Sequence, residues 1–161
     1  MKNAEQSDDL TMLVIRYTPK QFKSTLTETL TIKNDVQEVK RISEFLKSSI
    51  GKLDVDTSLA RRLRLAVEEA VVNVIDYAYP TDTEGDITIN MMSVGQTLHF
   101  QIIDEGIAFD PTAKQKTDTT LSVEERQIGG LGILLVRELM DSINYERTDG
   151  KNILTPFKKI K

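Results

Sequence analysis

A long amphipathic helix, expected over residues 57–79, constrains the fold more than any other feature of the chain. Its apolar residues recur every three or four positions, which predicts one buried stripe along the helix. The stripe consists of Leu59, Leu63, Ala66, Val67, Ala70, Val71 and Val74. A stripe of this width has to pack against a second layer of structure, so the chain is expected to form a layered domain.

Two polar residues, Glu69 and Asn73, lie at the margin of this stripe. They are four positions apart and therefore share one helix face, about one turn from each other. One interpretation is an ordinary polar pair at the solvent boundary. The other is a functional pair, in which the amide oxygen holds a hard cation and the carboxylate accepts a proton.

Length and composition indicate a globular protein of one domain. The chain has 161 residues and no cysteine, which excludes disulfides and thiolate metal sites. Residues 1–22 are interpreted as a polar N-terminal extension and residues 23–161 as the domain. No apolar run approaches the ~20 residues of a membrane span, and the N-terminus lacks the pattern of a signal peptide. We therefore expect a cytoplasmic protein without a membrane partner.

Charge and histidine content exclude further classes of function. The net charge of −4 argues against direct nucleic-acid binding, which would require a basic surface. The single histidine, His99, lies in a segment that alternates like a strand. This position argues against a histidine-based triad, a multi-histidine metal site and a phospho-acceptor histidine on a helix.

The remaining periodicities predict an α+β two-layer sandwich, in which a mixed sheet carries helices on one face. Asn34 is expected to cap the first helix, and either Asp56 or Thr57 the second. The expected elements are a strand over 24–32, helices over 34–51 and 57–79, strands over 87–91 and 98–104, a helix from 129 to 140, and a closing hairpin over 143–154. Residues 110–128 form a polar connection, and a connection of this length is usually functional or mobile.

The strand over 98–104 runs into Asp104-Glu105-Gly106. An aspartate at a strand end can accept a hydrogen bond from an exocyclic amine, and the glycine lets a flat ring approach the backbone. The same three residues also suit an ordinary turn.

A glycine-rich segment, Gly129-Gly130-Leu131-Gly132, precedes the third helix. Free backbone N–H groups at a helix N-terminus are favourable for binding phosphate. The segment lacks the Gly-Lys-Ser/Thr of a P-loop. A glycine-rich helix entry without a ligand is the competing interpretation.

The order of the three motifs indicates more than each motif alone, because one nucleotide site accounts for all of them. In this hypothesis Asn73 holds Mg²⁺ and Glu69 activates a hydroxyl group or water. Asp104 selects adenine, and residues 129–132 hold phosphates beneath a lid.

These motifs resemble those of the gyrase–Hsp90–histidine-kinase–MutL ATPase superfamily, and within it the stand-alone anti-sigma-factor serine-protein kinases. The resemblance covers about residues 24–161. Its motifs are Glu69-Ala70-Val71-Val72-Asn73, the run from Asp104 to Pro111, and Gly129-Gly130-Leu131-Gly132-Ile133. It implies the Bergerat ATP-binding fold.

The resemblance also implies a role for each site residue. Glu69 would be the catalytic base, Asn73 the Mg²⁺ ligand and Asp104 the adenine contact. Gly106 would pack under adenine, and Ala108 replaces the usual second glycine of that motif. The other residues of the implied nucleotide site are Arg126, which would reach the γ-phosphate, Gly129, Gly130, Leu131 and Gly132 along the phosphates, and Thr155, which would support adenine through water.

The implied function is that of an anti-sigma factor that is also a serine/threonine protein kinase using ATP and Mg²⁺. It would phosphorylate an anti-anti-sigma partner (a STAS-like protein), sequester a sigma factor and act as a homodimer. The alternative is a nucleotide-gated switch that binds a partner and transfers phosphate slowly or not at all.

Overall fold

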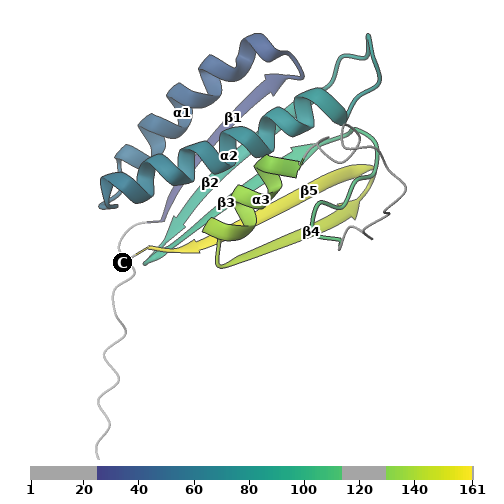
Figure 1. Ribbon diagram of the computed structural model, residues 1–161. Helices are drawn as coiled ribbons and strands as arrows, with labels where there is room; N and C mark the ends of the chain where they lie inside the picture. Colours follow the sequence, from purple (N-terminus) through teal and green to yellow (C-terminus); the bar gives the residue numbers. More distant parts are fainter. Residues whose placement is uncertain (1–24, 114–129, 161) are drawn as a thin grey trace, which may run out of the picture.

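A computed structural model describes residues 25–113 and 130–160 of the chain. Its centre is a five-stranded sheet with the strand order β1-β2-β3-β5-β4. The helices lie together on one face of this sheet (Figure 1). The predicted α+β sandwich of two layers is therefore confirmed.

The expected helices and strands are all present among the described residues. In chain order they are β1 (Leu26–Lys33), the short 3₁₀ helix η1 (Val36–Glu38), α1 (Val39–Gly51), α2 (Thr57–Tyr77), β2 (Asp86–Val94), β3 (Thr97–Asp104), α3 (Gly130–Leu139), β4 (Ser142–Thr148) and β5 (Lys151–Lys159). The extension expected over residues 1–22 lies outside the described residues. Within the described ranges, no helix is both long enough and apolar enough to cross a bilayer.

The direction of the strands differs from the expectation of a mixed sheet, because all four described pairings are antiparallel. The helices α1 and α2 lie between β1 and β2 in the chain, and β2 runs back along β1 in the opposite direction. Between β3 and β4 the described residues contain one helix, α3, and these two strands do run in the same direction. However, β5 lies between them and pairs antiparallel with both.

The core lies between the sheet and the helices, with α2 across its middle (Figure 1). The stripe predicted on α2 is buried there, although Leu59 and Val74 are only partly buried. Asp56 caps α2 by accepting from the N–H groups of Ser58 and Leu59. One of the two expected caps is thereby confirmed.

Asn34 has a different role from the predicted helix cap. Its amide donates to the carbonyl of Thr83 at 2.8 Å and accepts from the N–H of Gly85 at 2.8 Å. The neighbouring residue Asp35 caps η1 by accepting from the N–H of Gln37. Asn34 therefore ties the end of β1 to the loop between α2 and β2.

Candidate functional site

A pocket of about 220 Å³ lies between the C-terminal half of α2, the end of β3 and the strands β4 and β5. It contains Asn73 and Asp104, which come from two of the three predicted motifs. Its full lining is Ala70, Asn73, Val74, Tyr77, Ala78, Ile102, Asp104, Ile107, Phe109, Pro111, Ile133, Tyr145, Asn152 and Leu154. Most of these side chains are apolar, as expected for a pocket that holds a flat ring.

Asp104 lies at one end of the pocket and is only 4% exposed. Its Oδ1 accepts from the N–H of Gly106 at 2.9 Å and from Nδ2 of Asn152 at 2.8 Å. Among the described residues, no hydrogen bond uses Oδ2. The buried carboxylate is thus held by two donors through one oxygen, and its second oxygen accepts from no residue in the described ranges.

Asn152 on β5 was not identified from the sequence as a site residue. It is 6% exposed and pairs directly with Asp104 across the β3–β5 ladder. Its Oδ1 accepts from the hydroxyl of Tyr145 at 2.8 Å and from Nη1 of Arg147 at 2.6 Å. The signal for it was a polar residue at an inward position of the last hairpin, but identifying it requires the register between β3 and β5.

Gly106 is required by a close approach of two backbones. The N–H of Ile107 donates to the carbonyl of Ala78, at the end of α2, at 2.7 Å. A Cβ on Gly106 would lie only 2.3 Å from that carbonyl oxygen. The turn after β3 is thereby fixed against the end of α2, which is a structural reason for the glycine besides the one that the resemblance implies.

Tyr79 supports the same turn from the other side. Its hydroxyl donates to the carbonyl of Asp86 at 2.9 Å and accepts from the N–H of Glu105 at 3.0 Å. Burial is the main cause that raises the pKa of the Tyr79 hydroxyl above its usual value. The hydroxyl therefore stays protonated and keeps both bonds at neutral pH.

At the other end of the pocket, the start of α3 packs directly on α2. A Cβ on Gly132 would lie 2.7 Å from Nδ2 of Asn73 and 3.0 Å from Cβ of Glu69. The glycine therefore permits the contact between the two helices. The structure thus brings residues of the first and third motifs together, as the single-site hypothesis requires.

The amide of Asn73 has an unusual environment. Its Nδ2 is buried and has no hydrogen-bond partner in the part of the chain that the structure describes. Among the described residues, no hydrogen bond uses its oxygen either. An amide with its nitrogen buried and its oxygen unused fits the role of an oxygen ligand for Mg²⁺. No group of three or more acidic, histidine or cysteine side chains in the described ranges is arranged to hold a metal ion, so phosphates and water would have to complete the coordination.

Several predicted site residues are not brought to the pocket. Glu69 is partly buried beside Gly132 but does not line the pocket, and Ala108 is exposed outside it. Gly130 and Leu131 form the first residues of α3. Arg126 and Gly129 lie outside the described residues.

The assignment of Thr155 is not supported by the geometry. Side chains alternate along a strand, and Asn152, Leu154 and Pro156 are buried on the helix side of β5. Thr155 therefore points to the opposite face of the sheet. Pro156 also lies in this strand, although β5 is central in the sheet and proline cannot donate a hydrogen bond to a neighbouring strand. The pairing of β5 with β3 is interrupted there, between Leu154 and Phe157.

Apolar side chains form an exposed rim around the pocket. Phe109 is 58% exposed, Ile107 57% and Tyr77 47%, which is unusual for large apolar residues that lie side by side in one pocket. Arg137 on α3 donates to the carbonyls of Pro111 and Ala113 and so holds the chain near this rim.

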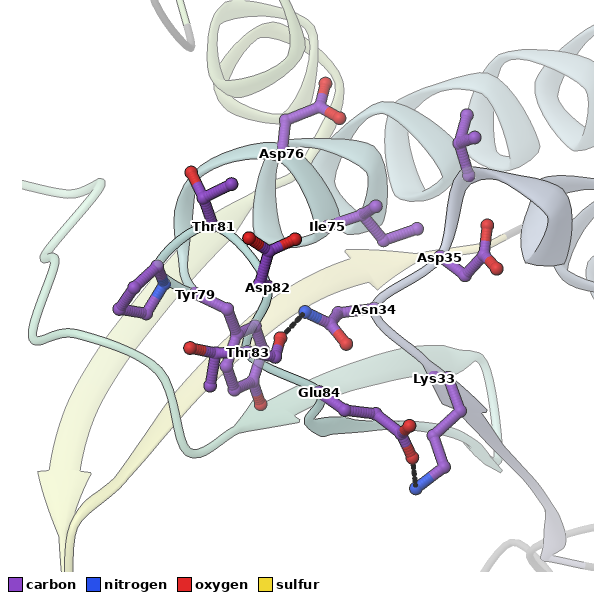
Figure 2. Close-up of a pocket in the computed structure, with 12 residues that line it drawn as sticks. Lys33, Asn34, Asp35, Ile75, Asp76, Tyr79, Thr81, Asp82, Thr83 and Glu84 are labelled. Carbon is purple, nitrogen blue, oxygen red and sulfur yellow. Dashed lines mark hydrogen bonds and ion pairs between the residues drawn. The ribbon is translucent and has the colours of Figure 1, made fainter.

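A second hollow, of about 600 Å³, lies between the end of β1 and the loop after α2. Figure 2 shows Asn34 bonded to Thr83 there and Lys33 paired with Glu84. The pair between Lys33 and Glu84 is exposed, so it contributes little to stability. No residue of the three motifs lines this hollow, and we therefore place the functional site at the smaller pocket.

Known proteins were compared with the chain. Residues 32–157 match the family model described as the histidine kinase-like ATPase domain. A serine/threonine-protein kinase of Bordetella bronchiseptica, BtrW, is 31% identical over 93 residues, or 58% of this chain and 66% of the relative. The serine-protein kinase RsbW of Listeria monocytogenes is 31% identical over 57% of this chain and 61% of the relative. RsbW of Bacillus subtilis is 30% identical over 56% and 59%.

The resemblance to serine-protein kinases is thus confirmed, and the match covers less than two thirds of the length of these relatives. Two solved structures share the fold. The RsbU and RsbW domains of a Mycobacterium tuberculosis protein match with a TM-score of 0.61 and 15% identity, over 84% of this chain and 32% of that chain. A histidine kinase domain from Erythrobacter litoralis matches with a TM-score of 0.50 and 17% identity, over 77% and 60%.

The family model spans most of the chain, including all three motifs in full and the pocket. The fold comparison agrees with it. The chain belongs to the histidine kinase-like ATPase domain family.

Proposed function

We propose that this protein is an ATP-dependent serine/threonine kinase that acts as an anti-sigma factor. One observation carries the proposal: Asn73 and Asp104 line the same pocket, and Gly132 packs against Asn73 and Glu69 at one end of it. Three motifs that are far apart in the sequence thereby meet around one space. The names of the relatives support protein phosphorylation as the activity.

Adenine would occupy the apolar part of the pocket. Oδ2 of Asp104, which accepts no hydrogen bond among the described residues, would accept one from the 6-amino group of the base. Ile102 and Leu154 provide apolar surface for the ring. A space of about 220 Å³ is small for a complete nucleotide, so the triphosphate would extend beyond it toward α3.

The phosphates would lie between α2 and the start of α3. The N-terminal turn of α3 presents backbone N–H groups that favour an anion. Asn73 would bind Mg²⁺ through its amide oxygen. When bound, Mg²⁺ would neutralise charge on the phosphates.

Glu69 would serve as the general base. It lies one helical turn before Asn73, so a carboxylate there is close to the proposed phosphate region. In phosphoryl transfer, such a group accepts the proton of the attacking serine or threonine hydroxyl. The phospho-acceptor would be an anti-anti-sigma protein of the STAS-like type, and the same chain would sequester a sigma factor. We further propose that it works in the cytoplasm as a homodimer.

The test combines nucleotide binding with transfer of labelled phosphate. The protein should bind ATP with Mg²⁺ in isothermal titration and transfer the γ-phosphate to a candidate anti-anti-sigma domain. Glu69→Gln should reduce the transfer rate by about 10²–10⁴-fold and leave ATP affinity nearly unchanged. Glu68→Gln, at the neighbouring position on a different helix face, is the matched control and should retain transfer.

The outcomes separate the proposed function from its alternative. ATP binding without any transfer, in the wild type as in Glu69→Gln, would overturn the kinase and favour a nucleotide-gated switch. The switch in turn requires that partner affinity differs between ATP, ADP and no nucleotide. No binding of ATP at all would overturn both.

A further inference from the structure

One amide side chain, Asn152, connects three strands at the Asp104 end of the pocket. Its Nδ2 donates to Asp104 Oδ1 at 2.8 Å and to the carbonyl of Ile107 at 2.9 Å. Its Oδ1 accepts from Tyr145 at 2.8 Å and from Arg147 at 2.6 Å. The amide therefore uses both of its donors and both lone pairs of its acceptor.

Arg147 fixes the direction in which this amide faces. A guanidinium has donors only, so the oxygen of Asn152 has to face it. The nitrogen of Asn152 must then face Asp104, where it donates to the carboxylate. A rotated amide would place its oxygen against the carboxylate and leave its nitrogen against the guanidinium, and both contacts are repulsive.

Arg147 also reaches the carboxylate by a second route. The same Nη1 that binds Asn152 donates to the carbonyl of Gly106 at 3.1 Å. Gly106 in turn donates its N–H to Asp104. Both donors that hold Oδ1 of Asp104 are thus anchored by one side chain on the outer strand β4, and a connected polar network of this kind favours a single arrangement.

We propose that Arg147 is a positioning residue for base selection. The inference rests on the proposed ATP site. Through Asn152 and Gly106, Arg147 holds Asp104 so that only Oδ2 faces the base. This arrangement suits the 6-amino group of adenine, whereas the 6-oxo group of guanine is a second acceptor and is repelled.

The holding of the carboxylate is what makes the selection possible. A carboxylate that is free to shift can accept instead from the ring N–H and 2-amino group of guanine. Loss of Arg147 should therefore raise the affinity for GTP relative to ATP. A residue with a purely structural role would weaken both nucleotides by the same factor.

The experiment measures the dissociation constants of the full chain for Mg-ATP and Mg-GTP. In Arg147→Met, the ratio of the GTP constant to the ATP constant should fall about tenfold, the size expected for one hydrogen bond to a charged group. The matched control is Arg41→Met, which removes another arginine with one exposed ion pair, on α1. Its ratio should equal that of the wild type.

Two further variants keep the test decisive. Arg147→Lys should retain most of the ratio, because both bonds use one nitrogen that an ammonium can replace. Tyr145→Phe keeps the ring in the pocket and removes one donor to Asn152, so a smaller fall is expected even where Arg147→Met does not fold. If the ratio of the GTP and ATP dissociation constants is unchanged in Arg147→Met, the inference about Arg147 is overturned while the proposed function stands. If Arg147→Met does not fold, an unchanged ratio in Tyr145→Phe has the same meaning. A wild type that binds neither nucleotide would overturn the proposed function and the inference with it.

Discussion

The two ends of the pocket differ in how complete they are without a ligand. At the Asp104 end, every hydrogen-bonding group of the Asn152 side-chain amide has a partner within the protein. At the Asn73 end, a buried amide nitrogen has no partner within residues 25–113 and 130–160. Buried polar groups are nearly always paired in stable structures, so the unpaired amide of Asn73, together with its place in the pocket, supports the proposal that a ligand completes this end.

The two ends differ in this way because they are built from different elements of the fold. The Asp104 end is built from neighbouring strands, whose ladders fix the side chains before any ligand arrives. The Asn73 end is built from two helices that meet at Gly132. In the proposed site, base recognition would therefore be preformed, while the phosphate region would be completed by the nucleotide.

The strongest test of this comparison removes the carboxylate at the preformed end. Asp104→Asn replaces the charged acceptor of two hydrogen bonds. Loss of a hydrogen bond to a charged group should weaken ATP by about 1.5–3 kcal/mol, or roughly 10–150-fold in Kd. Adenosine, which has no phosphates, should weaken by the same factor, and isothermal titration measures both.

Asn73→Ala is the counterpart at the other end. It should weaken Mg-ATP and leave adenosine unchanged, because the amide oxygen is proposed to act only through the metal and the phosphates. Equal loss of adenosine in both variants would contradict the division of the pocket into two ends.

A second prediction compares the glycines at the two ends. Gly106→Ala would place a methyl group 2.3 Å from the backbone oxygen of Ala78, which cannot move without shifting α2. Overpacking of this kind should lower the free energy of unfolding by about 1–3 kcal/mol in urea titration. Gly132→Ala meets the end of the Asn73 side chain first, so its loss of stability should be smaller.

Gly51→Ala is the control for this series, since a methyl group there meets nothing within 4 Å. At the end of α1 it should be neutral or stabilise by up to about 1 kcal/mol. If Gly132→Ala destabilises more than Gly106→Ala, the Asn73 end is the more rigid one and the comparison is reversed.

The smallest expected effect concerns Tyr79, which supports the turn at the preformed end. Tyr79→Phe removes one hydroxyl with two hydrogen bonds and should lower the free energy of unfolding by about 0.5–1.5 kcal/mol at pH 7. Burial raises the pKa of this hydroxyl in the folded state. Its contribution is therefore complete below the unfolded pKa of about 10 and is lost as the pH rises through the higher folded pKa.

Unfolding in urea between pH 7 and pH 11 checks this sign. The stability difference between wild type and Tyr79→Phe should shrink above about pH 10. A difference that stays constant across this range would show that the pKa of the hydroxyl is the same in the folded and unfolded states, contrary to the effect of burial.

Local patterns were sufficient for most of the fold. Spacing of three and four predicted α2 and its buried stripe, and alternation predicted the hairpin of β2 and β3. The closing hairpin was also predicted, and Asp149 and Gly150 at its turn have the positive φ that such hairpin turns need. The direction of the strands was not predicted correctly, because a connecting helix is compatible with a parallel neighbour until another strand is inserted between the two.

The same limit applied to the site. Asp104 and Asn73 could be selected from the sequence because each belongs to a motif with local spacing. Thr155 was chosen on β5 instead of Asn152, since one sequence cannot show which residues of a late strand face an aspartate almost fifty positions earlier. A shift by an odd number of positions along a strand, such as the three from Asn152 to Thr155, changes both the face and the partner.

The sequence by itself therefore determined the helices, the strands and the three motifs, because these depend on neighbours within a few residues of each other. Only the tertiary structure decided that Asn152 and Arg147 surround Asp104 and that Gly132 meets Asn73. Those contacts depend on strand register and on the packing of α3 against α2, which join residues that are distant in the chain. The physical reason is that the register between β3 and β5 depends on which face the whole sheet buries, in addition to the local strand patterns and turns.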